Sequence, residues 1–252
     1  MTFAPEELTR DGFLNGRLSI LQPKKGYRAA TDPVLLAAGV NAKSGESVLE
    51  LGCGVGVASL CLGWRISGLS LSGVEVQPDY AELAQRNASH NAIQMQVITA
   101  DIADFPEEIR QISYDHVIAN PPFLLAGSGT AAGNKSKETA FREDLPLAGW
   151  IDAGIKRVKP KGHFTMIHLA ERLPHILNCF GDRLGDVEVK PFASRAGRIA
   201  GRVLVRARKG GRGAFRLHPP LLLHCGESHK KDGDDFSEIA RNILRYGAQL
   251  DF

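Results

Sequence analysis

The stretch Ser47-Val48-Leu49-Glu50-Leu51-Gly52-Cys53-Gly54-Val55-Gly56 decides the fold of this chain. Its first half is typical of a buried strand, and three glycines then alternate with other residues. From Val57 to Gly63 the pattern resumes as a helix. A strand, a glycine-rich turn and a helix place backbone N–H groups and a helix N-terminus around a small ligand. The stretch therefore predicts a ligand-binding turn at one edge of an α/β sheet.

The rest of the 252-residue chain repeats this alternation of strands and helices. Further strands are expected at 69–76, 95–99, 114–119, 163–169, 187–192 and 202–208. Helices are expected at 34–40, 79–91, 106–111, 145–158, 171–180 and 235–246. Asp32 as N-cap followed by Pro33 predicts the start of the first helix. Such alternation predicts one α/β domain over residues 1–252, with a mostly parallel, seven-stranded sheet covered by helices on both faces.

Two segments interrupt the alternation. Residues 1–31 are expected to form an N-terminal extension, in which Asn15-Gly16 predicts a two-residue turn of a small hairpin. Residues 126–144 are mostly small and polar. A loop of this length in a compact domain is usually functional or disordered, so we expect a flexible loop that contacts the substrate.

Three nucleotide-binding turns can be compared with residues 50–56. The dinucleotide pattern GxGxxG fails because Val57 stands where the third glycine is needed. The P-loop pattern fails at Gly133-Asn134-Lys135-Ser136, because Asn134 separates Gly from Lys and no strand precedes it. In contrast, Glu50 to Gly56 matches the Glu-x-Gly-x-Gly-x-Gly turn of S-adenosylmethionine-dependent methyltransferases throughout.

Polar residues also end the next three predicted strands. Glu75, Asp101 and Asn120 follow one another in this position. Open α/β sheets bind ligands at the carboxyl ends of their strands. The carboxylate of Glu75 could accept ribose hydroxyls, and that of Asp101 could accept an adenine amine. Asn120 begins Asn120-Pro121-Pro122-Phe123, a rigid corner because the two prolines cannot continue the strand.

With these residues the chain resembles class I S-adenosylmethionine-dependent methyltransferases that carry an Asn-Pro-Pro-aromatic motif and methylate exocyclic or amide nitrogens. The resemblance implies a Rossmann-like fold and S-adenosylmethionine as cofactor. It implies cofactor contacts from Arg28, Thr31, Glu50, Gly52, Gly54, Gly56, Glu75, Asp101 and Asn120. Within that set, Glu50 would face the cofactor's amine, and Arg28 and Thr31 would close over the cofactor from the N-terminal side.

The closer resemblance is to bacterial tRNA adenine-N6 methyltransferases that act beside the anticodon. It is carried by Gln22-Pro23-Lys24-Lys25-Gly26-Tyr27-Arg28, Asp32-Pro33-Val34-Leu35-Leu36 and Leu204-Val205-Arg206-Ala207-Arg208-Lys209-Gly210. Those enzymes commonly have Tyr where this chain has Phe123, and ribosomal-RNA guanine-N2 methyltransferases also have Phe there. Protein glutamine-N5 methyltransferases that act on release factors use the same corner. All three substrates therefore stay open.

The Asn-Pro-Pro-Phe motif predicts the chemistry of methyl transfer. A planar exocyclic amine is a poor nucleophile because its lone pair is delocalised. The side-chain oxygen of Asn120 and the carbonyl of Pro121 can each accept one of its N–H groups, and orientation then supplies most of the catalysis. Pro122 would keep the corner rigid, and Phe123 would stack on the target base. No metal is expected, because the chain has no HExxH and no zinc-type His and Cys spacing.

The net charge of +3 conceals a basic segment. Residues 183–216 contain ten Lys and Arg residues against two acidic ones, which favours an RNA partner, and tRNA first. Phosphate contacts are expected from Lys135, Lys137, Arg142, Arg195, Arg198, Arg202, Arg208 and Lys209. Four cysteines without a CxxC pair fit a reducing cytoplasm. We expect no membrane segment, and the sequence favours neither a monomer nor a homodimer.

Overall fold

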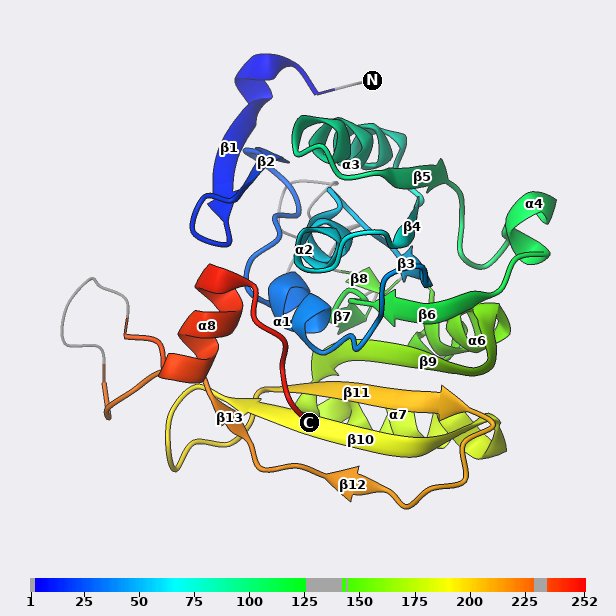
Figure 1. The fold of residues 1–252 in the computed structure, drawn as a ribbon, viewed down its shortest axis with the longest axis vertical. Helices are drawn as coiled ribbons and strands as arrows, with labels where there is room; N and C mark the ends of the chain where they lie inside the picture. Colours follow the sequence, from blue (N-terminus) through cyan, green and yellow to red (C-terminus); the bar gives the residue numbers. More distant parts are fainter. Residues whose placement is uncertain (1–2, 126–141, 144, 229–234) are drawn as a thin grey trace.

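A nine-stranded sheet forms the centre of the molecule (Figure 1). The computed structural model describes residues 3–125, 142–143, 145–228 and 235–252. Along the sheet the order is β12-β10-β11-β9-β6-β3-β4-β5, and β13 also pairs with β10. The strands are β3 (Ser47–Leu51), β4 (Ser70–Glu75), β5 (Met95–Thr99), β6 (Tyr114–Ala119), β9 (Val158–Leu169), β10 (Leu184–Ala193), β11 (Arg202–Lys209), β12 (Arg216–Leu217) and β13 (Leu221–Leu222).

The predicted α/β, Rossmann-like arrangement is confirmed. Strands β5, β4, β3, β6 and β9 are parallel neighbours, and β11 runs antiparallel to both β9 and β10. All seven predicted strands lie in this sheet. The sequence missed β12 and β13, which have two residues each and lie at the edge beside β10. Strands this short carry no periodic pattern of their own.

Helices cover both faces of the sheet, and each face has its own hydrophobic core. The first core contains α1 (Asp32–Ala38), α2 (Val57–Arg65), α3 (Pro78–His90) and α8 (Glu238–Tyr246). The second contains α4 (Glu107–Arg110), α6 (Leu147–Arg157) and α7 (Leu173–Phe180). In Figure 1 α7 lies behind β10 and β11. Short 3-10 turns lie at η1 (Pro5–Glu7), η2 (Ala170–Arg172) and η3 (Gly181–Arg183). None of the helices described is both long and apolar enough to cross a bilayer.

The start of α1 differs from the prediction. The helix includes Asp32, and its N-cap is Thr31, whose side chain caps no backbone N–H. Oδ2 of Asp32 instead accepts a hydrogen bond from Nε of Arg202 at 3.1 Å. An ion pair from β11 therefore takes the place of the predicted capping bond.

The predicted N-terminal hairpin is present, but its turn is longer. Strands β1 (Leu8–Phe13) and β2 (Leu18–Pro23) end on the pair Phe13 and Leu18, which leaves four residues in the loop. Leu14 adopts a φ of 49° and is only 1% exposed. Burial of this side chain widens the turn beyond the two residues expected from Asn15-Gly16.

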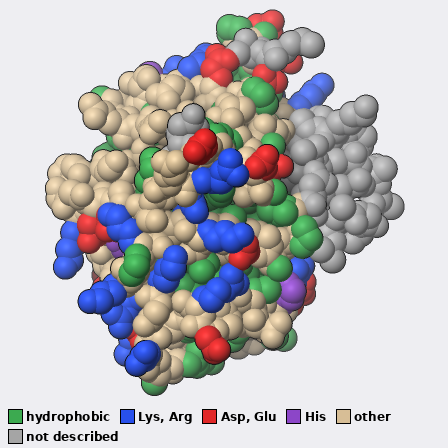
Figure 2. All heavy atoms as spheres, turned by 90° about the vertical axis from the view of Figure 1, so that its right-hand side faces the viewer, with side chains coloured by type: hydrophobic (Ala, Val, Ile, Leu, Met, Phe, Trp, Pro, Cys, Tyr) green, Lys and Arg blue, Asp and Glu red, His purple; other side chains and the backbone are tan. Residues whose placement is uncertain are grey.

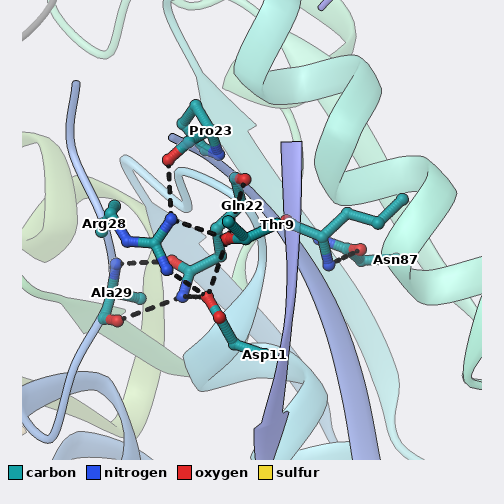
Figure 3. Close-up of polar contacts among 8 residues, drawn as sticks. Thr9, Asp11, Gln22, Pro23, Arg28, Ala29 and Asn87 are labelled. Atoms are coloured by element: carbon teal, nitrogen blue, oxygen red, sulfur yellow. Dashed lines mark hydrogen bonds and ion pairs between the residues drawn. The ribbon is translucent and has the colours of Figure 1, made fainter. Parts of the chain in front are cut away.

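Polar contacts join the hairpin to the body of the protein (Figure 3). Nε2 of Gln22 donates to Asp11 at 2.7 Å, and Oε1 of Gln22 accepts the backbone N–H of Ala29 at 2.8 Å. The guanidinium of Arg28 donates to Asp11 at 2.6 Å and to the carbonyl of Pro23 at 2.9 Å. Asn87 of α3 bonds both backbone groups of Leu21. These hydrogen bonds thus connect the hairpin to the segment around Arg28 and to α3.

The predicted substrate loop lies mostly outside the described residues, which omit 126–141 and 144. Its flanks are described. Strand β7 (Leu124–Leu125) pairs in parallel with β8 (Arg142–Glu143), so the two ends of the segment lie side by side directly after the Asn-Pro-Pro-Phe corner.

Candidate active site

A cavity of about 940 Å³ opens at the carboxyl ends of the parallel strands. Strand β3 lies between β4 and β6, where the order of the strands reverses, and open sheets bind ligands at such points. The cavity is lined by residues from the glycine turn, the ends of the parallel strands and the segments that face them, among them Tyr27, Arg28, Thr31, Asp32, Gly52, Gly54, Glu75, Asp101, Asn120, Pro121, Pro122, Phe123, Trp150 and Arg202.

The glycine turn forms the floor of this cavity. Gly52 has a φ of 62°, and a Cβ there would lie 2.5 Å from the ring of Trp150. A Cβ on Gly54, at a φ of 53°, would lie 3.4 Å from the ring of Tyr27. Both positions therefore need glycine for conformation, and Gly52 needs it for space as well. Gly56 does not line the cavity; it needs glycine for its φ of 90°, since a Cβ there would only touch Ala84 of α3 at 3.5 Å.

Glu75 holds the glycine turn while it faces the cavity. Its Oε2 accepts the N–H of Gly54 at 2.9 Å, and its Oε1 accepts the N–H of Gln77 at 2.9 Å. The side chain is nearly buried, and burial raises the pKa of its carboxyl above the ordinary value. Each carboxylate oxygen keeps a further lone pair for a donor from a ligand.

Glu50 lies deeper than the resemblance implied. It is buried and does not line the cavity, and its Oε2 accepts both the backbone N–H (2.9 Å) and the hydroxyl (2.5 Å) of Ser59. These bonds tie β3 to the first turn of α2. Burial raises the pKa of Glu50 from 4.5 to about 7.

This raised pKa predicts a pH-dependent stability. The folded protein holds the Glu50 proton more tightly than the unfolded chain, so this contribution is full below about pH 4.5 and is lost as the pH rises through about 7. Relative to the wild type, Glu50→Gln should therefore gain up to about 3 kcal/mol in the free energy of unfolding between about pH 5 and about pH 8. Urea denaturation at both pH values measures it.

Asp152→Asn is the matched control for that experiment. Hydrogen bonds from Lys156 and Arg183 hold the pKa of Asp152 below its ordinary value, so its titration falls below the window. The wild-type slope should persist in this variant. An unchanged slope in Glu50→Gln would contradict the assignment.

The other predicted cofactor contacts differ in how freely they face the cavity. Asp101 is exposed, and its Oδ1 accepts a hydrogen bond from the backbone N–H of Ala103 at 2.8 Å. Thr31 is exposed at the rim. Arg28 lines the cavity, but Asp11, Thr9 and Pro23 hold its guanidinium toward the hairpin.

Asn120 presents an unsatisfied acceptor at the cavity. Its Oδ1 is buried and has no hydrogen-bond partner among the described residues. Nε1 of Trp150 is in the same condition within this part of the chain. A buried polar atom without a partner is costly, and in a native protein it commonly marks a place for a ligand. The corner can therefore accept an N–H from a bound molecule.

The ring of Phe123 is held from two directions. Cζ of Arg202 lies 4.5 Å from its centroid, and the ring of His168 meets it edge-on at 5.2 Å. Nδ1 of His168 faces the N–H of Leu169 at 2.8 Å, and burial is the main cause that lowers the pKa of this imidazole to about 4. His168 is therefore neutral and packs against the motif.

Sequence reasoning missed Tyr27, Asp32, Trp150 and His168 as parts of this site. The bonding of Asp32 to Arg202 and the contact of Trp150 with Gly52 join distant segments. No local pattern reports such contacts.

The predicted phosphate contacts divide into several groups. Arg198 is exposed and Arg202 lines the cavity. Arg195 is buried and donates to the carbonyls of Cys225 and Gly226 and to Asp235. Arg208 pairs with Asp186, and Nζ of Lys209 donates to the carbonyls of Ile155 and Val158. Lys135 and Lys137 lie outside the described residues, as does the side chain of Arg142.

The basic segment is therefore spread over the molecule. In the register of β11 against β9, Arg208 lies opposite His163, whereas Arg202 lies opposite Leu169 at the end of β9. Arg202 and Arg208 thus lie toward opposite ends of the sheet. Figure 2 shows further Lys and Arg side chains on the lower half of the side where α4 lies. Of residues 183–216, only Arg202 lines the cavity.

Comparison with known proteins supports a common origin with methyltransferases. Residues 30–136 match the family model described as Methyltransferase small domain. A protein of Actinobacillus succinogenes is 31% identical over 163 residues, which cover 62% of this chain and 67% of that protein. One from Shewanella baltica is 29% identical over 201 residues, which cover 78% of this chain and 81% of its own. Both relatives are named tRNA1(Val) (adenine(37)-N6)-methyltransferase.

Solved structures share the fold. A predicted O-methyltransferase from Agrobacterium tumefaciens matches with a TM-score of 0.68 at 23% identity, covering 87% of this chain and 98% of that one. A T. thermophilus 16S rRNA N2 methyltransferase, solved with AdoMet and guanosine, matches with a TM-score of 0.55 at 20% identity, covering 80% of this chain and 50% of that one. At these identities the likeness concerns the fold.

Proposed function

Since the chain belongs to the S-adenosylmethionine-dependent methyltransferases of the small domain family, we propose that it methylates the exocyclic amine of an adenine in tRNA. The observation that carries this proposal is the unpartnered Oδ1 of Asn120 beside the ring of Phe123 in one cavity. The names of the relatives supply the adenine and the tRNA.

The cavity floor fits S-adenosylmethionine, which when bound supplies an electrophilic methyl group. Gly52 and Gly54 line the cavity with backbone alone, so the methionine portion can approach the main chain there. Glu75 would accept the ribose hydroxyls, and Asp101 would accept the adenine amine. Glu50 and Gly56 would support the turn from behind. Thr31 and Arg28 would close the N-terminal side.

The acceptor side needs no strong base. Oδ1 of Asn120 and the carbonyl of Pro121 each take one N–H of the target amine, which frees its lone pair from the ring. Orientation of the nitrogen toward the methyl group then supplies most of the rate. Pro122 keeps the corner rigid, and the target base stacks on Phe123. Stacking on an aromatic side chain contributes roughly 1–3 kcal/mol per base.

Arg202 joins the two halves of this site. Its guanidinium lies over Phe123 and donates to Asp32 at the start of α1. We propose that it keeps the ring in position and contacts a phosphate of the RNA. Arg198, Lys135, Lys137 and Arg142 are proposed as further phosphate contacts. Arg195, Arg208 and Lys209 are engaged within the protein, so they are proposed as structural.

Two other acceptors remain as alternatives, the guanine N2 amine of ribosomal RNA and the glutamine amide of a release factor. Labelled S-adenosylmethionine offered with tRNA, ribosomal RNA or release factor separates the three. We expect label in tRNA that digestion assigns to N6-methyladenosine. Label in protein or in guanine would replace the proposal by one of the alternatives.

The remaining proposals concern organisation. One domain over residues 1–252 agrees with the bonds that tie the hairpin to α3. A cytoplasmic location is proposed from the cysteines, all four of which are free thiols.

A further inference from the structure

The loop between β10 and β11 carries an apolar side chain that nothing in the described structure covers. Ile199 is 95% exposed, the largest exposed fraction among the large apolar residues described. Single exposed apolar residues are common on protein surfaces, so exposure alone carries no function. Ile199 differs from such residues because its loop is held by hydrogen bonds and leads directly to Arg202 at the cavity.

The loop is held firmly in place. Arg195 at its base is buried and donates to Cys225, Gly226 and Asp235. The N–H of Arg198 donates to the carbonyl of Arg195 at 3.2 Å, and Gly197 between them has a φ of 70°, the signature of a type II turn. The N–H of Gly201, at the end of the loop, donates to the carbonyl of Phe192 at 3.1 Å. Ile199 thus lies on a loop whose two ends are held by hydrogen bonds.

This loop leads into β11 at the edge of the sheet where the cavity opens, because Arg202 pairs with Leu169 at the carboxyl end of β9. Arg202 follows three residues after Ile199 and lines the cavity beside Phe123. The Cα atoms of Ile199 and Arg202 therefore lie within about 11 Å of each other. The N–H of Ala170 donates to the carbonyl of Gly201 at 3.2 Å, which brings η2 with Arg172 to the same rim. Arg198 and Arg202 thus flank Ile199 in the chain, and Arg172 follows two residues after Ala170, which bonds to the end of the same loop.

We propose that Ile199 is a wedge that enters the base stack of the RNA and fills the place of the base that turns into the cavity. The inference rests on the proposed RNA substrate. A stacked base cannot reach the Asn120 oxygen, so it must leave its stack. Apolar side chains that insert between bases offset the cost of unstacking, and the arginines beside Ile199 attract the phosphates on either side. A protein partner or a lipid surface would need a wider apolar patch.

Ile199→Ala tests the wedge with two RNA substrates. On folded tRNA we expect kcat/KM to fall by about 10-fold or more, while a short unstructured RNA with the same target changes by less than about 2-fold, because its base is already unstacked. A 2-aminopurine next to the target should brighten when the wild-type protein binds and should brighten less with the variant. Ile199→Leu keeps a large apolar side chain, so its kcat/KM on tRNA and its 2-aminopurine signal should match those of the wild type.

Ile239→Ala is the matched control, because Ile239 is 58% exposed on α8 and does not line the cavity. It should leave both substrates unchanged. Equal activity of Ile199→Ala and wild type on tRNA would overturn the wedge, and so would an equal loss on both RNAs. If the wild-type protein methylates neither RNA, the proposed function itself fails. Methylation by the wild type together with an unaffected Ile199→Ala overturns the wedge alone.

Discussion

Asn120→Ala is expected to lower kcat by about 100- to 1,000-fold, the scale seen when one pre-oriented polar group is removed from an active site. The variant loses the acceptor that we propose for the amine, while Gly52, Gly54, Glu75 and Asp101 stay intact. Affinity for S-adenosylmethionine should therefore change by less than about 3-fold, or under about 1 kcal/mol. Single-turnover kinetics and calorimetry measure the two quantities separately.

The stability of this variant gives a second readout. Oδ1 of Asn120 is buried without a partner in the described structure, so its removal also removes a desolvation cost. We expect the free energy of unfolding to stay within about 1 kcal/mol of the wild type. Asn41→Ala is the control, since Oδ1 of Asn41 is likewise buried and unpartnered there but Asn41 does not line the cavity. It should keep full activity, and an equal loss of cofactor binding and turnover in Asn120→Ala would make Asn120 a cofactor ligand instead.

Gly52→Ala is expected to weaken S-adenosylmethionine binding by about 100-fold or more, because it combines backbone strain with a collision. The new Cβ would lie 2.5 Å from the ring of Trp150, so either the turn or the indole, both of which line the cavity, must move. Titration with the cofactor, followed by calorimetry, measures the loss.

Gly16→Ala separates the two causes. Gly16 has a φ of 82°, and a Cβ there meets nothing within 4 Å. This variant carries the backbone strain without the collision, so it should lose about 1 kcal/mol of stability and keep its cofactor affinity. Unchanged binding by Gly52→Ala would show that the glycine turn is not the floor of the cofactor site.

The sequence predicted most of the sheet because its strands are apolar and lie between clear turns. It also brought Glu75, Asp101 and Asn120 to one edge, because parallel strands place their carboxyl ends together. It could not predict that Glu50 turns toward Ser59, since a strand residue can face either side of its sheet. It could not predict the burial of Arg195 either, because the partners of that side chain lie about 30 and 40 residues away.

We propose that this chain places a methyl group on an adenine N6 in tRNA. The most direct measurement is mass spectrometry of nucleosides from purified tRNA and ribosomal RNA of a strain that lacks the gene, compared with the same strain carrying the wild-type gene or Asn120→Ala. We predict that N6-methyladenosine decreases in the tRNA of the deletion strain, returns with the wild-type gene and does not return with the variant. Unchanged N6-methyladenosine in tRNA, with loss of N2-methylguanosine from ribosomal RNA, would contradict the claim.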